Sequence, residues 1–339
     1  MTVTPLPSAP PVAPGTTVRV TVAVPTFRRP ADLRAGLPML LEQIRELTRR
    51  ADGRYAAELL VVDNDPDRSA APVLAELAAP DVRYVPEPTP GIAAVRNRAI
   101  AEASGSRLLS FIDDDERPTP GWLAALVDTW ETYGSAAVVG RMLTRFAGEL
   151  DPWVEAGDFF FRSSRPTGTP REVAACGNLL LDLDQVRGMG LRFDSALALG
   201  GGEDSLFSRA LVRAGGRIVW CDESAAVDFV PLDRMTRRWV LTRAWSHGNT
   251  DTLTELRLTS GLVPRTRVRA QGVGRGMLRV AGGAARCGLG VLTRSHRHQA
   301  RGLRALLRGA GMVGGACGIV YEEYARSGRR WRFSRTAAR

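Results

Sequence analysis

The 339-residue chain contains no lysine, so all 46 of its basic residues are arginine. Aromatic residues make up only 6% of it, and no apolar run reaches the roughly 18 residues of a membrane-spanning helix. The four cysteines are far apart and form no Cys-x-x-Cys pair. The spacing therefore gives no zinc or dithiol motif and predicts free thiols.

Two common nucleotide-binding signatures are also missing. No Gly-x-Gly-x-x-Gly follows the first expected strand, 18–24, and the chain has no phosphate loop of the kind found in kinases and ATPases. Residues 1–17 lack the basic and apolar regions of a secretory signal, and we expect a disordered leader there. These absences argue against a dehydrogenase and against a P-loop enzyme.

The net charge of +10 is unevenly distributed along the chain. Residues 1–260 carry 29 Arg against 34 acidic residues, whereas residues 261–339 carry 17 Arg against 2. The tail contains two candidate amphipathic helices, 277–292 and 303–324. An Arg-bearing helix with an apolar face is typical of proteins that bind an anionic membrane surface. This predicts a cytoplasmic protein that is held peripherally at the inner face of the plasma membrane. The alternative is that the tail is a helical cap packed on the rest of the chain. Nucleic acid is the least favoured partner.

Expected strands and helices alternate between residues 18 and 248. Apolar runs predict strands at 18–24, 59–62, 82–85, 107–112, 178–183 and 218–220, with 222–230 extended. Helical spacing predicts helices at 33–47, 92–100, 120–130, 204–211 and 237–247, and an irregular loop at 151–171. Thr119 is the expected N-cap of its helix, and Gly248 the expected stop of the last one. Short connections of this kind predict right-handed crossovers and a parallel α/β sheet.

An acidic run, Asp113-Asp114-Asp115-Glu116, follows the apolar strand at 107–112. Ligands of open α/β sheets bind at the carboxyl ends of the strands, and adjacent carboxylates favour a hard divalent cation such as Mn²⁺ or Mg²⁺. Asp115 and Asp113 are the candidate metal ligands, and Asp113 is also a candidate for a ribose contact. Asp114 is expected to point away from them, because side chains alternate along an extended segment. A solvated acidic turn is the alternative.

A second acidic motif, Glu203-Asp204, follows three glycines, 200–202. The expected helix start favours an ionised carboxylate, and such a group within reach of a hydroxyl can act as a general base. Simple N-capping by Asp204 is the alternative.

Several single residues are candidates for binding. Asp63 ends an expected strand and could accept a hydrogen bond from a base or ribose, or form an ordinary Asp turn. Arg96 could reach a phosphate or a neighbouring Asp, or lie on a helix surface. Candidate contacts to a diphosphate stand further along the chain, each with a structural alternative; they are Arg234, Arg238 and His247.

The ordered set of motifs resembles family 2 glycosyltransferases with the GT-A fold. The motifs are Val-Ala-Val-Pro-Thr-Phe-Arg-Arg from Val22, Leu-Val-Val-Asp-Asn-Asp from Leu60, Gly-Ile-Ala-Ala-Val-Arg-Asn from Gly91, Ser-Phe-Ile-Asp-Asp-Asp-Glu from Ser110, and Gly-Gly-Glu-Asp-Ser-Leu-Phe from Gly201. Their variants are most similar to exopolysaccharide glycosyltransferases of the succinoglycan-assembly type.

The resemblance implies a metal-dependent, inverting transfer from a nucleotide-diphosphate sugar to a glycan or a lipid-linked acceptor. It implies Asp204 as the catalytic base, with Glu203 beside it, and Asp113 and Asp115 as the metal-binding Asp-x-Asp. The implied contacts to the nucleotide sugar come from these residues: Pro25, Thr26, Arg28, Asp63, Arg96, Asp113 and Asp114. It further implies a GT-A domain at 18–260 and a separate helical tail at 261–339.

Two departures from the family pattern stand out. The usual Asp-Asp-Gly-Ser is Asp-Asn-Asp-Pro at 63–66, and Met235 occupies the Gln position of the Gln-x-x-Arg-Trp found in processive synthases. The second departure argues against a processive polymerase. A sugar nucleotidyltransferase and a non-catalytic scaffold of a polysaccharide-assembly complex are the alternative functions.

Overall fold

The computed structural model describes residues 16–50, 53–195, 201–321 and 333–335. The chain divides into two compact units, each of which is described by itself. The first unit contains the described parts of 1–143, 162–198 and 203–228, and the second contains those of 144–161, 199–202 and 229–339. This division differs from the predicted boundary at residue 260. Nearly all of the expected leader and the first glycine of 200–202 lie outside the described residues.

Nine strands of the described residues form one mixed sheet, in the order β3-β2-β1-β4-β8-β6-β9-β5, with β7 beside β9. They are β1 (Val18–Thr26), β2 (Tyr55–Asp63), β3 (Val82–Pro86), β4 (Leu108–Ile112), β5 (Glu116–Pro118), β6 (Ala137–Phe146), β7 (Pro170–Arg171), β8 (Asn178–Asp182) and β9 (Ile218–Val230). The first four strands pair in parallel, as the βα alternation predicts. The ladder from β4 to β8 is antiparallel, and so are those from β8 to β6 and from β9 to β5.

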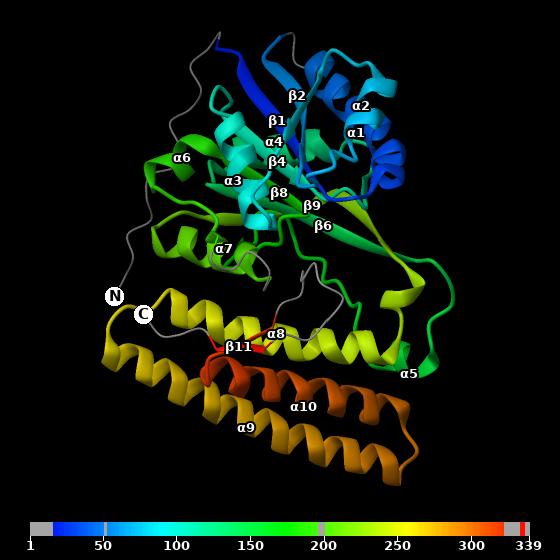
Figure 1. Ribbon diagram of the computed structural model, residues 1–339, viewed down its shortest axis with the longest axis vertical. Coiled ribbons are helices and arrows are strands. Elements are labelled where there is room, and N and C mark those ends of the chain that lie inside the picture. The colour runs from blue at the N-terminus through cyan, green and yellow to red at the C-terminus, as the bar shows by residue number, and fades with distance from the viewer. Residues whose placement is uncertain (1–15, 51–52, 196–200, 322–332, 336–339) are drawn as a thin grey trace. The chain divides into compact units, whose positions relative to one another are not determined.

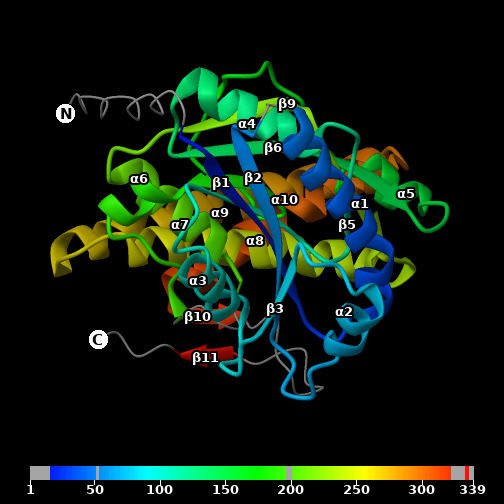
Figure 2. The ribbon, with the colours of Figure 1, turned by 90° about the horizontal axis from the view of Figure 1, so that it is seen from above.

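Helices cover both faces of this sheet (Figure 2). They are α1 (Pro30–Arg50), α2 (Ala71–Leu77), α3 (Ile92–Glu102), α4 (Trp122–Tyr133), α6 (Leu183–Gly188) and α7 (Glu203–Arg213). Leucines of α1 at helical spacing, such as Leu33, Leu37 and Leu40, are buried with Trp122 of α4 in one apolar layer. Phe207 of α7 is buried with α3 and α6 residues in the other. The predicted α/β sheet of the GT-A type is confirmed, and it is mixed: β1 to β4 pair in parallel, whereas β8 pairs antiparallel with β4 and β6, and β9 with β5 and β7.

The second unit is mainly helical. It contains α5 (Pro152–Ala156), the short η2 (Leu232–Arg234), α8 (Arg237–Arg257), α9 (Leu262–Leu292), α10 (His296–Ala316), β10 (Ile319–Tyr321) and β11 (Phe333–Arg335). Figure 1 shows α8, α9 and α10 side by side, and the Asn249 side chain of α8 bonds to the carbonyl groups of Gly311 and Ile319. None of the described helices is both long enough and apolar enough to cross a membrane.

Two predicted helix ends are wrong. The N-cap before α4 is Gly121 in the left-handed region with φ of 75°, not Thr119, whose hydroxyl donates instead to the carbonyl group of Ala225. Helix α8 runs through Gly248 to Arg257. The glycine at position 248 lets the backbone of α10 come close to α8. A Cβ at Gly248 would lie 1.9 Å from the carbonyl oxygen of Arg308. The glycine therefore serves helix packing rather than helix termination.

Candidate functional site

The acidic run lies in a turn at the carboxyl end of β4, beside the end of β1. Thr26 is the last residue of β1, and its hydroxyl donates to Asp114 Oδ2 at 2.8 Å. Arg29 Nη1 lies 2.8 Å from Asp114 Oδ1 and 2.5 Å from Asp115 Oδ2. Asp114 is buried against the β1 end, and Asp115 meets the same arginine. The alternation expected for an extended segment is wrong here, because the segment turns.

Electrostatics in this turn are unbalanced toward negative charge. Burial raises the pKa of Asp114 to about 6, and Asp115 adds to this effect while Arg29 opposes it. Burial also raises the pKa of Asp113, and the neighbouring Asp115 and Asp204 raise it further. Glu116 Oε2 accepts a hydrogen bond from the Asp113 amide at 3.2 Å, and burial together with Asp113 holds the pKa of Glu116 well above the usual range. A bound cation would relieve this repulsion.

Arg96 of α3 joins the acidic turn to the start of α7. Its side chain is buried and forms an ion pair with Glu203 Oε1, while its Nη2 lies 3.8 Å from Asp113 Oδ1. Burial alone would lower the pKa of Arg96, but the surrounding acidic groups, Cys176 and Glu203 foremost, raise it. The Phe193 ring lies under the guanidinium group at 5.6 Å. The structure thus brings Arg96 and Asp113 together with Glu203, which lies far from both in the sequence.

Asp204 and Glu203 have different surroundings, although they are neighbours in the first turn of α7. Glu203 is buried, whereas the Asp204 residue is only partly buried. The Asp204 Oδ1 accepts a hydrogen bond from the Ser205 amide at 2.6 Å. The negative charge of Asp204 contributes to the raised pKa of Asp113. Gly202 precedes this turn with φ of +88°, a conformation that side chains other than glycine rarely adopt.

Asp63 shapes the loop after β2. Its carboxylate is fully buried and accepts bonds from the backbone amides of Asp65 and Ala70 and from the Tyr84 hydroxyl. Burial and the nearby Asp63 raise the pKa of Tyr84 to about 12. Pro25 pairs with Val62 in the register of β1 and β2. The Asp63 carboxylate oxygens already accept these three hydrogen bonds. The predicted contact to a nucleoside would therefore have to use the remaining lone pairs of the same oxygens.

Arg28 and Arg29 diverge at the end of β1. Arg28 has φ of 56° in the left-handed region, and its side chain pairs with Asp65 at 3.0 Å and Asp67 at 2.8 Å in the β2 loop. Arg29 turns to the acidic run instead. Thr26 and Arg28, two of the predicted nucleotide-sugar contacts, therefore lie at the carboxyl edge of the sheet. Arg29 lies at the same edge.

The acidic run supplies the candidate donors of a metal site. In the part of the chain that the structure describes, no group of three or more His, Cys, Asp or Glu side chains is arranged to hold a metal ion. Asp113 and Asp115 still supply two carboxylates whose repulsion a cation would relieve. Mg²⁺ is commonly held by one or two carboxylates together with substrate phosphates. The donor set fits a metal that shares its coordination with a diphosphate.

Residues 21–182 match the model of the family described as "Glycosyl transferase family 2". The chain is also 31% identical over 244 residues to the "Succinoglycan biosynthesis protein ExoM" of Rhizobium meliloti (strain 1021), covering 70% of this chain and 75% of that protein. The chain belongs to glycosyl transferase family 2. It is therefore a glycosyltransferase, and the matched region contains the acidic run and Arg96.

Solved structures show weaker likenesses to this family 2 glycosyltransferase. A crystal structure of GalNAc-T7 with UDP, GalNAc and Mn²⁺ has a TM-score of 0.49 and 14% identity, and the match covers 71% of this chain but only half of that one. The structure of S. aureus TarS 1-349 in complex with UDP-GlcNAc has a TM-score of 0.48 and 13% identity. The match covers 93% of this chain and 99% of that one. Both TM-scores are under 0.5, and the family assignment follows from the family model and the curated relative.

The remaining predicted contacts of the glycosyltransferase lie in the second unit. Arg234 ends η2, Arg238 belongs to the first turn of α8, and His247 lies near the middle of α8. Their predicted contacts to a diphosphate stay predictions.

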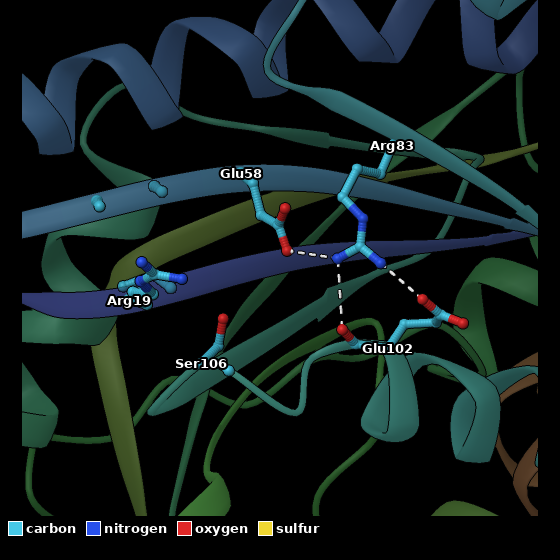
Figure 3. A pocket seen from close by; sticks show the side chains of 9 residues that line it. Arg19, Glu58, Arg83, Glu102 and Ser106 are labelled. Atoms are coloured by element: carbon cyan, nitrogen blue, oxygen red, sulfur yellow. Dashed lines mark hydrogen bonds and ion pairs between the residues drawn. The ribbon is translucent and has the colours of Figure 1, made fainter.

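A cavity of about 300 Å³ lies at the opposite, amino-terminal ends of the parallel strands (Figure 3). Its lining includes Arg19 of β1, Glu58 of β2 and Arg83 of β3. Arg83 already bonds to Glu58 at 3.0 Å and to the Glu102 carboxylate at 2.6 Å, and the dashed lines in Figure 3 mark these pairs. Since ligands of open α/β sheets bind at the carboxyl ends, this cavity is not the donor site.

Sequence reasoning missed two residues of the candidate site. Arg29 neutralises part of the acidic run, and Glu116 was included in the run without a role of its own. The only signal for Arg29 is its place between a strand end and Pro30, the first residue of α1. Glu116 lies so near Gly177 that a Cβ on the glycine would be 2.2 Å from Glu116 Oε1. A side chain at position 177 would therefore displace the Glu116 carboxyl, which accepts a hydrogen bond from the Asp113 amide.

Proposed function

We propose that this chain is an inverting, non-processive glycosyltransferase that moves a sugar from a nucleotide-diphosphate sugar to a hydroxyl group of a glycan or lipid-linked acceptor. The observation that carries the proposal is the contrast between Glu203 and Asp204. Arg96 pairs with the buried Glu203 carboxylate, whereas Asp204 is more open and its charge acts on Asp113. A general base must reach its proton donor, so the more open carboxylate is the base.

The proposed reaction is a single displacement. Asp204 accepts the proton of the acceptor hydroxyl as that oxygen attacks the anomeric carbon, and the bond to the nucleotide diphosphate breaks on the opposite side. Attack from the opposite side inverts the configuration at that carbon. Arg96 holds α7 by its pair with Glu203, and this pair keeps Asp204 oriented.

Donor binding is proposed at the carboxyl ends of β1, β2 and β4. Thr26 and Asp114 fix the geometry of the acidic turn, and the loop that Asp63 shapes would receive the nucleoside. Asp113 and Asp115 would hold Mn²⁺ or Mg²⁺, which when bound supplies positive charge next to the diphosphate. Arg29, which already pairs with Asp114 and Asp115, would add positive charge near the diphosphate. The contacts of Arg234, Arg238 and His247 to a diphosphate stay predictions.

The proposed biological role is the assembly of an exopolysaccharide or another cell-surface glycan. The relative in Rhizobium meliloti is named for succinoglycan biosynthesis, and the identity of 31% extends over most of both chains. We place the protein in the cytoplasm, peripherally at the inner face of the plasma membrane. The proposal names a class of donor and acceptor but no particular sugar.

Binding and slow hydrolysis of nucleotide sugars test the proposal. The full chain is screened against a panel of nucleotide-diphosphate sugars with and without Mn²⁺, by calorimetry and by release of the nucleoside diphosphate. We expect one nucleotide class to bind only with the metal. Asp115→Ala should abolish the metal-dependent part of binding, and Asp128→Ala, a change of an exposed aspartate on α4, should not. Metal-dependent affinity that survives Asp115→Ala would remove this residue from the metal site.

A further inference from the structure

Helix α9 has one face that is fixed by close contact with α10. The buried residues of α9 are glycines, namely Gly272, Gly276, Gly283 and Gly290. A Cβ at Gly283 would lie 2.5 Å from the Leu306 amide nitrogen, and one at Gly276 would lie 2.8 Å from the carbonyl oxygen of Gly309. The two helices therefore touch backbone to backbone, and Figure 1 shows them lying side by side. Such packing makes the pair a rigid support.

The opposite face of α9 is apolar and exposed. Leu278, Ala285 and Leu292 follow Gly276, Gly283 and Gly290 by two residues each, which is about 200° around a helix of 3.6 residues per turn. Leu278 is 75% exposed and Leu292 is 84% exposed. Further exposed apolar residues of this helix are Met277, Leu289 and Val291. A row of exposed large apolar side chains marks an interaction site.

Arginines border this outward face. Arg275, Arg279 and Arg286 are spaced by four and seven residues, which puts them on one line along the helix. Arg275 and Arg279 are exposed, and Arg286 is partly buried. Residues 261–321 contain 11 Arg and no Asp or Glu. The face thus combines apolar side chains with a single sign of charge.

This combination favours a lipid surface over the other possible occupants. Nucleic acid would be bound by the arginines but would leave the leucines in water. A second copy of the chain, docked by two-fold symmetry, would bring two arginine-bordered faces together, and their charges would repel. An anionic bilayer matches both properties, since its headgroups attract arginine and its interior accepts leucine.

We propose that the outward face of α9 lies in the interface of an anionic bilayer, with Leu278, Leu289 and Leu292 inserted and Arg275, Arg279 and Arg286 at the headgroups. The α9–α10 pair lies along the surface. The inference deepens the proposed function, because it names the helix that brings the enzyme to a lipid-linked acceptor. It does not depend on the donor or on the catalytic residues.

Vesicle binding by the full chain tests this surface. Co-sedimentation is measured with vesicles of phosphatidylcholine alone and with 30% phosphatidylglycerol. Two variants of α9 are compared, Leu278→Asp with Leu289→Asp, and the triple change of Arg275, Arg279 and Arg286 to Gln. The matched control changes three exposed arginines of α1 to Gln, Arg45, Arg49 and Arg50, and so removes the same charge from the other unit. Thermal unfolding of each variant checks that it is folded.

We expect the wild type and the α1 control to bind the anionic vesicles, and binding to weaken as salt rises. Each α9 variant should bind them about 10-fold more weakly or worse, since each loses apolar insertion or headgroup contacts. Equal binding by all folded variants would overturn the proposal, as would equal binding to neutral vesicles. A wild-type dimer that the leucine variant converts to a monomer, with no vesicle binding by either, would assign the face to a second copy. Nucleotide-sugar binding, measured without lipid, reports on the proposed function separately.

Discussion

Arg96 and Glu203 are 107 residues apart in sequence and form a buried ion pair that joins α3 to the first turn of α7. Both side chains are about 5% exposed, at 6% and 5%. The second oxygen of the glutamate, Oε2, has no hydrogen-bond partner in the structure. Glu203 therefore depends on Arg96 for its charge compensation, and in the proposed mechanism this pair orients the neighbouring Asp204.

The stability of the chain should reflect this dependence. Arg96→Met leaves a buried carboxylate without its cation and should lower the free energy of unfolding by about 3–5 kcal/mol. Adding Glu203→Met to the same chain should recover most of the loss, since an apolar pair replaces the ion pair. Both are measured by urea unfolding.

Arg98→Met is the control for this experiment, because Arg98 lies on the same helix and its pair with Glu102 is at the surface. It should change the free energy of unfolding by less than about 0.5 kcal/mol. A cost of Arg96→Met no larger than that of the control would contradict the buried pair.

Adjacent glycines of α9 provide a second test of the structure. A Cβ at Gly283 would meet the α10 backbone, whereas nothing lies within 4 Å of one at Gly282. Gly283→Ala should therefore lower the free energy of unfolding by about 1–3 kcal/mol through overpacking. Gly282→Ala should raise it by up to about 1 kcal/mol, because alanine favours the helix. Thermal or denaturant unfolding of both variants measures the difference, and the reverse order would show that the other face of α9 packs on α10.

His247 should make the stability of the second unit depend on pH. Burial, Arg243 of the same helix and Arg308 of α10 lower the pKa of His247 to about 4, with Arg304 acting in the same direction and Asp251 opposing it. The unfolded chain, with an ordinary histidine pKa near 6.5, then binds a proton between pH 6.5 and pH 4 that the folded chain does not. The free energy of unfolding should fall as pH falls through this window.

Because the His247 residue is exposed to solvent, which screens these charges, we expect the slope to be modest. His247→Gln cannot be protonated and should remove it, which parallel urea titrations at pH 7 and pH 5 can detect. A variant that loses as much stability as the wild type between these two pH values would show that other groups cause the dependence.

The parallel half of the fold could be predicted, and the antiparallel half could not. Strands β1 to β4 are apolar runs followed by turn residues, as in Leu59–Val62 before Asp63. Strand β6 was missed because its second half, Arg141–Phe146, mixes charged and apolar residues and is only partly buried. The strand directions of β8 and β9 depend on packing between distant segments, which local patterns do not encode.

The residue types of the candidate site could be recognised from the sequence, but the partners of those residues could not. The acidic run and the Glu203-Asp204 pair can be recognised in the sequence. The difference in burial between Glu203 and Asp204 cannot. Arg29 was missed in favour of Arg28, because the left-handed backbone at Arg28 decides which of the two reaches the acidic turn. That backbone conformation is uncommon for a residue other than glycine, and no sequence signal marks it.

Turnover and donor affinity of two neighbouring variants, Asp204→Asn and Glu203→Gln, test the central claim most directly. Asp204→Asn keeps the size of the side chain but cannot take the acceptor proton, so transfer should fall by about 10²-fold or more with donor KM nearly unchanged. Glu203→Gln should have the milder effect on transfer, because Glu203 only holds α7 through Arg96. An inactive Glu203→Gln beside an active Asp204→Asn would contradict the account, and so would full transfer by both.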